Sequence, residues 1–148
     1  MKPLVLGNLS YGMYAIGVKD GSRPNACIAN TVMQISKATP SDAALVAVAL
    51  SKENYSCQCV EQEGIFSISV LSQDTPATVI GALGFVSGRG VDKLGNIRHK
   101  VLIEGVPVIK EKIGRASCAR SWRSWTSPAK WCLWRRLSPA ATRPWAPP

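Results

Sequence analysis

Long apolar runs are absent from this sequence, and their absence limits where the protein can act. The longest run of purely apolar residues is 43–50, which is eight residues, whereas a membrane-spanning helix needs about 20. The opening Met1-Lys2-Pro3 leads into only a brief apolar stretch, without the longer apolar segment of a secretory signal. We therefore expect no membrane insertion and no export, and we place the protein in the cytoplasm.

Cysteine is neither abundant nor regularly spaced in the 148 residues. The five cysteines are Cys27, Cys57, Cys59, Cys118 and Cys132. An odd number at irregular spacing disfavours a secreted disulfide framework and fits a reducing compartment. Only Cys57 and Cys59 lie close together, helical positions i and i+2 point to different faces, and the single histidine is His99. We predict buried or idle thiols and no metal site.

Motifs for acid–base or nucleophilic catalysis are also missing. His99 lies in a charged stretch that favours a solvated loop, and we find no Ser-His-Asp arrangement. The acidic residues are scattered, so no carboxylate pair suggests glycosidase or protease chemistry. The glycines after residue 80 do not spell G-x-G-x-x-G and end a predicted helix, which argues against a Rossmann fold. We predict no catalytic side chain.

Acidic residues are absent from the last 34 residues, and this absence divides the chain at Gly114. Residues 1–114 carry 11 Lys and Arg against 9 Asp and Glu, as an ordinary soluble domain does. Residues 115–148 carry 7 Lys and Arg, all five tryptophans and five of the ten prolines. Alternating cations and aromatics can bind nucleic acid or an anionic surface, but the prolines prevent a continuous helix. We keep this function of the tail as a minor alternative and do not expect a nucleic-acid partner.

Strands outnumber helices in the pattern of the remaining residues. β-Branched, aromatic and small residues predict strands at 11–18, 27–36, 43–50, 65–71, 101–103 and 106–109. A turn at 19–22 joins the first two strands through Asp-Gly. One helix is predicted to begin after Ser51 or Asn54 and to end at Gly64, and another runs from Pro76 to about Gly84. This order favours a mainly β fold, an antiparallel barrel with inserted helices.

Five segments in register resemble one known family. They are L-S-Y-G-M-Y (9–14), I-A-N-T-V-M-Q-I-S (28–36), L-S-K-E-N-Y-S (50–56), G-I-F-S-I-S-V-L-S-Q-D-T-P (64–76) and I-G-A-L-G-F-V-S-G-R-G-V-D-K (80–93). Over about residues 5–109 the chain resembles the flavin reductase-like, FMN-binding split-barrel family. Within it, the small ferric reductases, the flavoredoxins and the flavin-reductase part of rubredoxin fusions are the most similar types. The resemblance implies a six-stranded antiparallel barrel that binds FMN at a homodimer interface.

The resemblance also implies which residues hold the cofactor. Polar residues that interrupt an apolar strand would face the edge of the flat flavin ring, and they are Asn30, Thr31, Gln34 and Ser36. Residues at a strand-to-helix junction would receive the FMN phosphate, and they are Ser51, Lys52, Asn54 and Ser56. Residues after the second helix would close the site, and they are Phe85, Ser87, Gly88 and Arg89, with Arg89 as a possible phosphate ligand. Solvent-facing strand residues, helix capping and an idle surface arginine are the structural alternatives.

The function that the resemblance implies is flavin reduction. A nicotinamide cofactor, NADH or NADPH, would pass hydride to FMN, and the reduced flavin would deliver electrons to a small acceptor or a partner protein. The absence of a catalytic side chain fits this chemistry, because the protein then contributes position and electrostatics. The alternative is a module that binds FMN, or nothing, without being reduced by a nicotinamide cofactor.

Three positions depart from the family pattern near the expected site. Gly90 stands where aspartate is common, Leu94 stands where phenylalanine follows Asp-Lys, and Cys57 stands where histidine is frequent. These departures bear more on contacts with a substrate than on the flavin site itself.

The larger departure comes after Ile109, where family members continue with an acidic, valine-rich stretch and a final barrel strand. In this chain the sequence becomes basic instead. Its prolines, and the lack of the alternation of apolar and polar residues that strands show, predict irregular structure over 115–148. One permitted codon set for residues 121–127, read two nucleotides later, encodes Leu-Glu-Glu-Leu-Asp-Val. Our hypothesis is a frameshift near Arg115, with a divergent tail as the alternative. In either case we expect a barrel that is incomplete at its C-terminal end.

Overall fold

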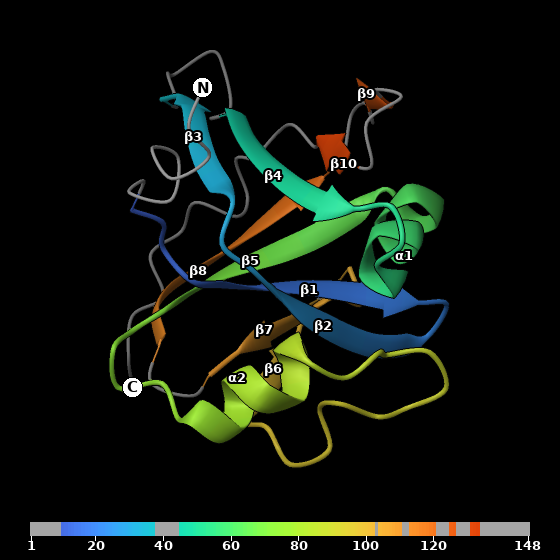
Figure 1. Cartoon of the computed structure of the whole chain (residues 1–148). Coiled ribbons are helices and arrows are strands. Elements are labelled where there is room, and N and C mark those ends of the chain that lie inside the picture. The colour runs from blue at the N-terminus through green and yellow to red at the C-terminus, as the bar shows by residue number, and fades with distance from the viewer. Residues whose placement is uncertain are drawn as a thin grey trace, which may run out of the picture.

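The structure, a computed structural model, describes residues 10–37, 45–102, 104–110, 113–120, 125–126 and 131–133, the last three segments without their side chains. The strands are β1 (Tyr14–Asp20), β2 (Arg23–Ala29), β3 (Val32–Ser36), β4 (Leu45–Ser51), β5 (Ile65–Leu71), β6 (His99–Val101), β7 (Pro107–Ile109), β8 (Ile113–Arg120), β9 (Trp125–Thr126) and β10 (Trp131–Leu133). The helices are α1 (Tyr55–Glu63) and α2 (Ala77–Gly84). Most of the regular structure is therefore strand, as predicted (Figure 1).

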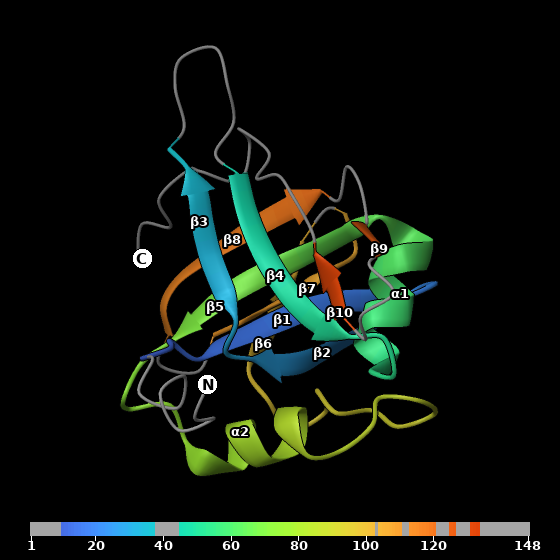
Figure 2. The same ribbon diagram turned by 45° about the horizontal axis from the view of Figure 1, so that its top comes forward.

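The strands form three antiparallel sheets. One sheet has the order β2-β1-β5-β8, a second has the order β3-β4-β10-β9, and β6 pairs with β7 in a third. Every pairing between described strands is antiparallel. Figures 1 and 2 show β3 and β4 lying across one side of the layer formed by β1, β5 and β8, while α2 lies on the other side. This arrangement is the barrel with inserted helices that the sequence predicts.

Alternation along β1 divides the core into two parts, because successive strand residues point to opposite faces. Ile16 and Val18 point into the barrel and pack in one cluster with Phe66. Ala15 points to the other side and packs in a second cluster with Leu83 of α2. All five side chains are at most 1% exposed. Burying a large apolar side chain contributes about 1.5–3 kcal/mol, so both clusters hold their elements firmly.

Single residues determine both ends of α1. Asn54 caps the start, where its Oδ1 accepts a hydrogen bond from the backbone N–H of Ser56 at 2.9 Å. Gly64 ends the helix with φ 65°, and its N–H donates to the carbonyl of Val60 at 2.9 Å. Of the two predicted caps, Asn54 is the one that the helix uses. α1 and α2 have 9 and 8 residues, and no helix in the described part of the chain is long and apolar enough to cross a membrane.

The predicted bounds of the strands are confirmed in some places and wrong in others. β5 has the predicted bounds, 65–71. The single strand predicted at 27–36 is wrong, because the chain forms β2, bends at Asn30 and Thr31, and continues as β3. The bend is required because β2 pairs with β1 whereas β3 pairs with β4, so the chain passes from one sheet to another. Similarly, β1 begins at Tyr14 and not at residue 11.

The end of the chain differs from the expected irregular structure. Residues 113–120 form β8, which pairs with β5 along its whole length, and the predicted domain boundary at Gly114 falls inside this strand. β10 also pairs with β4. Strand pairing uses backbone N–H and C=O groups, and residues 113–120 contain no proline to interrupt it. The expectation is wrong for the paired residues, while 121–124, 127–130 and 134–148 lie outside the described residues.

Candidate functional site

A hollow of about 340 Å³ lies between the start of α1 and the loop that follows α2. Its walls are formed by Cys27, Ile28, Glu53, Asn54, Tyr55, Leu83, Gly84, Phe85, Val86, Ser87, Gly88 and Lys93. The hollow therefore joins two of the three segments that the sequence predicts for the site. Four of the predicted residues line it, namely Asn54, Phe85, Ser87 and Gly88.

The first wall is the junction between β4 and α1. Asn54 lines the hollow, but its Oδ1 is engaged in capping α1, so the alternative role of helix capping is confirmed for this residue. Ser51 Oγ accepts from the backbone N–H of Glu53 at 3.4 Å, and Ser56 is buried at 2% exposure. The N-terminal end of a helix carries a partial positive charge. This wall therefore suits an anionic group.

The second wall is the loop after α2. The missing Cβ of Gly84 would lie 3.5 Å from Ile28 Cγ1, so the end of α2 rests against β2. Phe85 is 88% exposed, which is unusual for an aromatic side chain at the edge of a hollow. At Gly88 a Cβ would collide with the side-chain amide of Asn25, so this close approach requires glycine. The loop thus combines a solvent-exposed aromatic residue at the edge of the hollow with a closely packed backbone.

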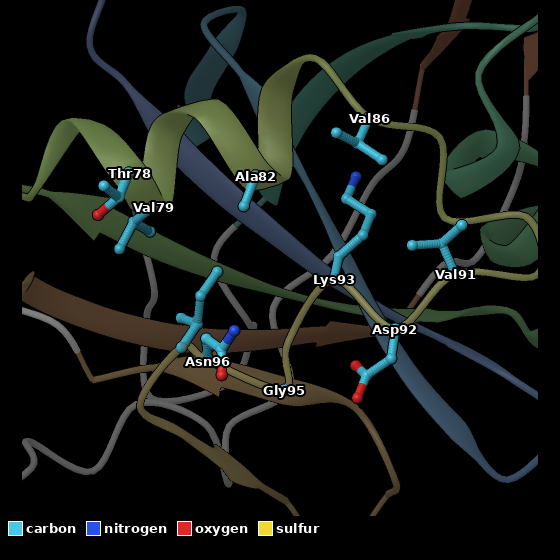
Figure 3. A pocket seen from close by; sticks show the side chains of 10 residues that line it. Thr78, Val79, Ala82, Val86, Val91, Asp92, Lys93, Gly95 and Asn96 are labelled. Atoms are coloured by element: carbon cyan, nitrogen blue, oxygen red, sulfur yellow. The ribbon is translucent and has the colours of Figure 1, made fainter.

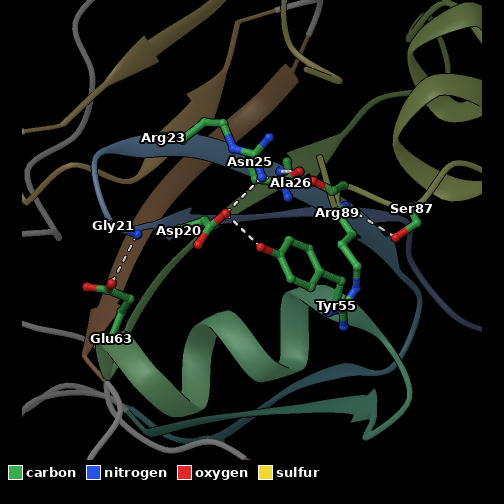
Figure 4. A network of polar contacts seen from close by, with 10 residues as sticks. Asp20, Gly21, Arg23, Asn25, Ala26, Tyr55, Glu63, Ser87 and Arg89 are labelled. Atoms are coloured by element: carbon green, nitrogen blue, oxygen red, sulfur yellow. Dashed lines mark hydrogen bonds and ion pairs between the residues drawn. The ribbon is translucent and has the colours of Figure 1, made fainter. Parts of the chain in front are cut away.

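Arg89 contacts α1 and does not line the hollow (Figure 4). Its guanidinium carbon lies 4.7 Å from the centre of the Tyr55 ring, and its Nη2 donates to Gln58 Oε1 at 2.8 Å. A guanidinium over an aromatic ring is a favourable cation–π contact. In this structure Arg89 therefore holds the loop after α2 against α1, which gives it a structural role beside the predicted phosphate contact.

Asp20 joins the same network from the β1–β2 hairpin. It accepts hydrogen bonds from the Tyr55 hydroxyl at 2.6 Å and from Arg23 Nη2 at 2.8 Å. These two donors, the tyrosine first, hold the pKa of the Asp20 carboxyl below its ordinary value. Arg23 also donates to the carbonyl of Gly88 at 3.2 Å, so the network ties hairpin, helix and loop together. The sequence reasoning missed all three residues, although Tyr55 belongs to the L-S-K-E-N-Y-S motif.

The four predicted residues at 30–36 do not line the hollow. Thr31 lies near it at the end of β4, because its carbonyl accepts from the N–H of Ala49 at 3.0 Å, and Asn30 is its neighbour. Gln34 and Ser36 lie at the far end of β3, where Gln34 Nε2 donates to the Ser36 carbonyl at 2.9 Å. On the same strand the side chains of Met33 and Ile35 are exposed, whereas Val32 packs against the core. This group therefore forms an open strand face.

Lys93 is the functional candidate that the sequence reasoning missed. Its side chain lines the hollow, yet the residue is only 8% exposed, and its Nζ donates to the Leu83 carbonyl at 2.9 Å. Burial lowers the pKa of Lys93, and burial raises the pKa of the neighbouring Cys27 thiol. The sequence signal was the Asp-Lys pair after the glycine-rich loop, but a lysine in a polar loop is ordinarily expected to be solvated.

A second hollow of about 370 Å³ lies under α2 (Figure 3). It is lined by Thr78, Val79, Ala82, Val86, Val91, Asp92, Lys93, Gly95, Asn96 and Ile97. Val86 and Lys93 belong to both hollows, so the Lys93 side chain lies in the wall between them. Figure 3 shows Lys93 pointing toward Val86 while Asp92 points away from it.

The cysteines that the structure describes are buried and reduced. Cys27, Cys57 and Cys59 are free thiols, which confirms the prediction of buried cysteines for these three. Within the described ranges, no group of three or more His, Cys, Asp and Glu side chains is placed to hold a metal ion. The side chains of Cys118 and Cys132 lie outside the described residues.

Comparison with known proteins relates this geometry to a family. The profile of the flavin reductase like domain matches residues 6–123, which is most of the chain. The chain belongs to the flavin reductase-like family. The family match extends beyond Gly114 and includes all of β8.

Two curated proteins match most of this chain in sequence. The chain is 38% identical over 111 residues to the high molecular weight rubredoxin of Moorella thermoacetica, covering 75% of this chain and 47% of that protein. It is 34% identical over 103 residues to the ferric-chelate reductase (NAD(P)H) of Archaeoglobus fulgidus, covering 70% of this chain and 59% of that protein. The chain thus spans about half the length of these relatives.

Solved structures support the same fold. The flavoredoxin of Methanosarcina acetivorans superposes with a TM-score of 0.76 at 17% identity, over 93% of this chain and 69% of the other. An FMN-binding protein from Thermus thermophilus superposes with a TM-score of 0.73 at 26% identity, over 86% of this chain and 69% of the other. The flavin reductase-like fold extends over nearly the whole chain in both superpositions.

Proposed function

We propose that this chain is a flavin reductase-type oxidoreductase that binds FMN in the hollow between α1 and the loop after α2. The observation that carries the proposal is the pairing of two walls: the positive end of α1 opposite a loop with an exposed aromatic ring. An anionic tail and a flat ring are the two parts of a flavin nucleotide. The names of the relatives, a ferric-chelate reductase (NAD(P)H) and a rubredoxin, support a redox function.

The residues around the hollow fit this group. The volume of about 340 Å³ lies within the range of about 300–1,000 Å³ that small-molecule sites occupy. Lys93 lines it and brings a donor to its wall. The Nδ2 of Asn25 also lacks a hydrogen-bond partner among the described residues, but it is buried under Gly88 and Asn25 does not line the hollow. Anionic and carbonyl groups are the natural acceptors for a lysine ammonium.

The chain's own residues would bind and orient the cofactor without moving protons. When bound, FMN would supply the chemistry of hydride and electron transfer between NADH or NADPH and an acceptor, so no catalytic side chain of this chain would be required. Phe85 would cover the ring. Asn54, Ser87 and Gly88, which line the hollow, would face the phosphate end, and the other predicted phosphate residues lie behind or beside them, namely Ser51, Lys52, Ser56 and Arg89. Of the four residues predicted for the ring edge, Asn30 and Thr31 lie nearer to the hollow and would reach the ring, whereas Gln34 and Ser36 lie at the far end of β3 and outside the hollow.

We also propose a homodimer, a redox partner protein and a cytoplasmic location. Exposed apolar side chains at the start of β1 and on β3 support a subunit contact, and they are Tyr11, Met13, Met33 and Ile35. The rubredoxin name of one relative supports a small electron-transfer partner. The three free buried thiols support a reducing compartment.

Oxidation of NADH and NADPH by the purified chain with added FMN tests the activity. We expect turnover above a control that contains the same nicotinamide and FMN without protein. FMN binding without turnover would favour the alternative of a non-catalytic FMN-binding module. Absence of both would contradict the proposal.

A second candidate, nucleic-acid or anionic-surface binding through residues 115–148, depends only on composition. Such binding should weaken steeply with rising salt, because it releases condensed counterions. FMN binding in a shaped hollow should depend on salt less. A salt series of both titrations therefore separates the two functions.

A further inference from the structure

Among the residues that the structure describes, Lys93 is a buried cation without a carboxylate partner. It is 8% exposed, and the ion pairs within the described residues join other side chains. Its neighbour Asp92 accepts from the backbone N–H of Leu94 at 2.9 Å and points away from it (Figure 3). Burying a charge without a partner is costly. Favourable contacts of the ammonium group must therefore offset this cost.

One of these contacts holds the end of α2. The carbonyl of Leu83 lies in the last turn of the helix and accepts one of the three ammonium N–H groups at 2.9 Å. Among the described residues this is the single hydrogen bond that Lys93 makes. The remaining ammonium donors are available to the hollow that the side chain lines.

The chemistry around the hollow defines what those donors would bind. The N-terminal end of α1 meets the same hollow through Asn54, and it adds a second source of positive potential. The charged acceptor side chain in the wall is that of Glu53, which is exposed and therefore screened by solvent. The Lys93 ammonium and the N-terminal end of α1 both favour an anionic, oxygen-rich group such as a phosphate.

We propose that Lys93 binds the phosphate group of the flavin nucleotide and thereby makes the site select FMN over riboflavin. The inference rests on the proposed function and adds a specificity-determining residue to it. Riboflavin has the same ring and sugar chain but no phosphate, so the two ligands separate the charge interaction from every other contact.

Titration of Lys93→Met with both flavins tests this inference. A buried hydrogen bond to a charged group corresponds to roughly a tenfold loss of affinity or more, so FMN binding should weaken by at least that factor. The affinity for riboflavin should change by less than about threefold, because riboflavin lacks the phosphate group that Lys93 would contact. Lys100→Met is the matched control, since Lys100 is exposed on β6 and its loss changes the net charge equally. Equal weakening of both flavins would show that Lys93 only holds α2 and would overturn the proposal.

A measurement on the unmodified chain covers the case in which Lys93→Met does not fold. With ¹⁵N-labelled lysine, the Nζ resonance of Lys93 is recognised by its low pKa, because burial lowers it. FMN should raise this pKa, since a nearby anion favours the ammonium form, and riboflavin should leave it where it is. An equal response to both flavins would overturn the inference. If neither flavin binds the unmodified chain, the proposed function itself fails.

Discussion

Individual residues at the hollow have structural roles beside the binding roles that we propose for them. Asn54 caps α1 and lines the hollow, Arg89 stacks on Tyr55 while holding the loop, and Lys93 donates to the last turn of α2 and lines the hollow. The sequence predicts Asn54 as a helix cap from a local signal, whereas the loop 85–89 is predicted from the resemblance to the family. Sequence reasoning missed Lys93, because burial of a lysine depends on packing between α2 and residues distant in the chain. Such packing leaves no local pattern.

Replacing Gly88 by alanine tests the close approach of the loop. The new Cβ would meet the Asn25 amide, so we expect destabilisation of about 1–3 kcal/mol and weaker FMN binding. Gly81→Ala is the matched control, since nothing lies within 4 Å of its missing Cβ and alanine favours a helix. Thermal melting of both variants measures the effect. Equal melting temperatures would show that the loop is loosely packed.

The lowered pKa of the Asp20 carboxyl predicts how the stability of the chain changes in acid. Its pKa is lower in the folded chain than its ordinary value of 3.8, so its stabilising contribution is present above that value. The contribution is lost as the pH falls through the folded pKa. Asp20→Asn should therefore be less stable than the unmodified chain at neutral pH, and the two should converge in acid. Denaturant unfolding across this pH range checks the prediction, and a constant difference would contradict it.

At the scale of elements, the β1–β2 hairpin holds α1 in place at both ends of the helix. Glu63 forms an ion pair with Lys19 at 3.1 Å and accepts from the backbone N–H of Gly21 at 3.2 Å, while Tyr55 bonds to Asp20 (Figure 4). The β1–β2 hairpin thus holds the helix at its first and last turns. Sequence patterns predicted α1, β5 and the Asp-Gly turn, where capping, alternation and φ 59° at Gly21 act locally. They did not predict the break between β2 and β3, which follows from pairing with two different sheets.

Removing the cap of α1 tests whether Asn54 acts through the helix. Asn54→Ala should cost about 1 kcal/mol of stability, because the N–H of Ser56 loses its acceptor. Asn54→Ser should restore most of the stability, since serine also caps helices. FMN affinity should follow the same order, because the helix start forms one wall of the hollow. Denaturant unfolding and FMN titration of the two variants measure both effects. An affinity that falls equally in both variants would instead assign Asn54 a direct contact.

The whole molecule depends on its last described strands, which extend both large sheets: β8 adds to the sheet of β2, β1 and β5, and β10 and β9 add to the sheet of β3 and β4. β8 pairs with β5 along its length, so the segment expected to be irregular covers what would otherwise be an open edge. Composition misled the prediction because strand pairing needs a backbone without proline more than it needs a particular side chain. Whether the side chains from residue 115 onward also suit a barrel strand is a separate question. Their composition, with seven Lys and Arg and no acidic residue, is unusual for such a strand.

Restoring the shifted reading frame from about residue 115 tests that question. The restored chain should melt at a higher temperature and bind FMN more tightly, because alternating apolar residues would then fill the last strands. Thermal melting and FMN titration of the two chains provide the comparison. If the chain as given is equally stable and binds equally tightly, the tail is a divergent end and not a frameshift.

Titration of the chain with FMN, followed by flavin fluorescence, tests the central claim most directly. We predict saturable binding that weakens by roughly two- to tenfold in Phe85→Ala, because an aromatic contact contributes about 0.5–1.5 kcal/mol. Melting should be unchanged in this variant, since Phe85 is 88% exposed. Val101→Ala, which removes an exposed apolar side chain on β6, should bind FMN as the unmodified chain does. Absence of saturable binding, or equal affinities in all three chains, would contradict a flavin site at this hollow.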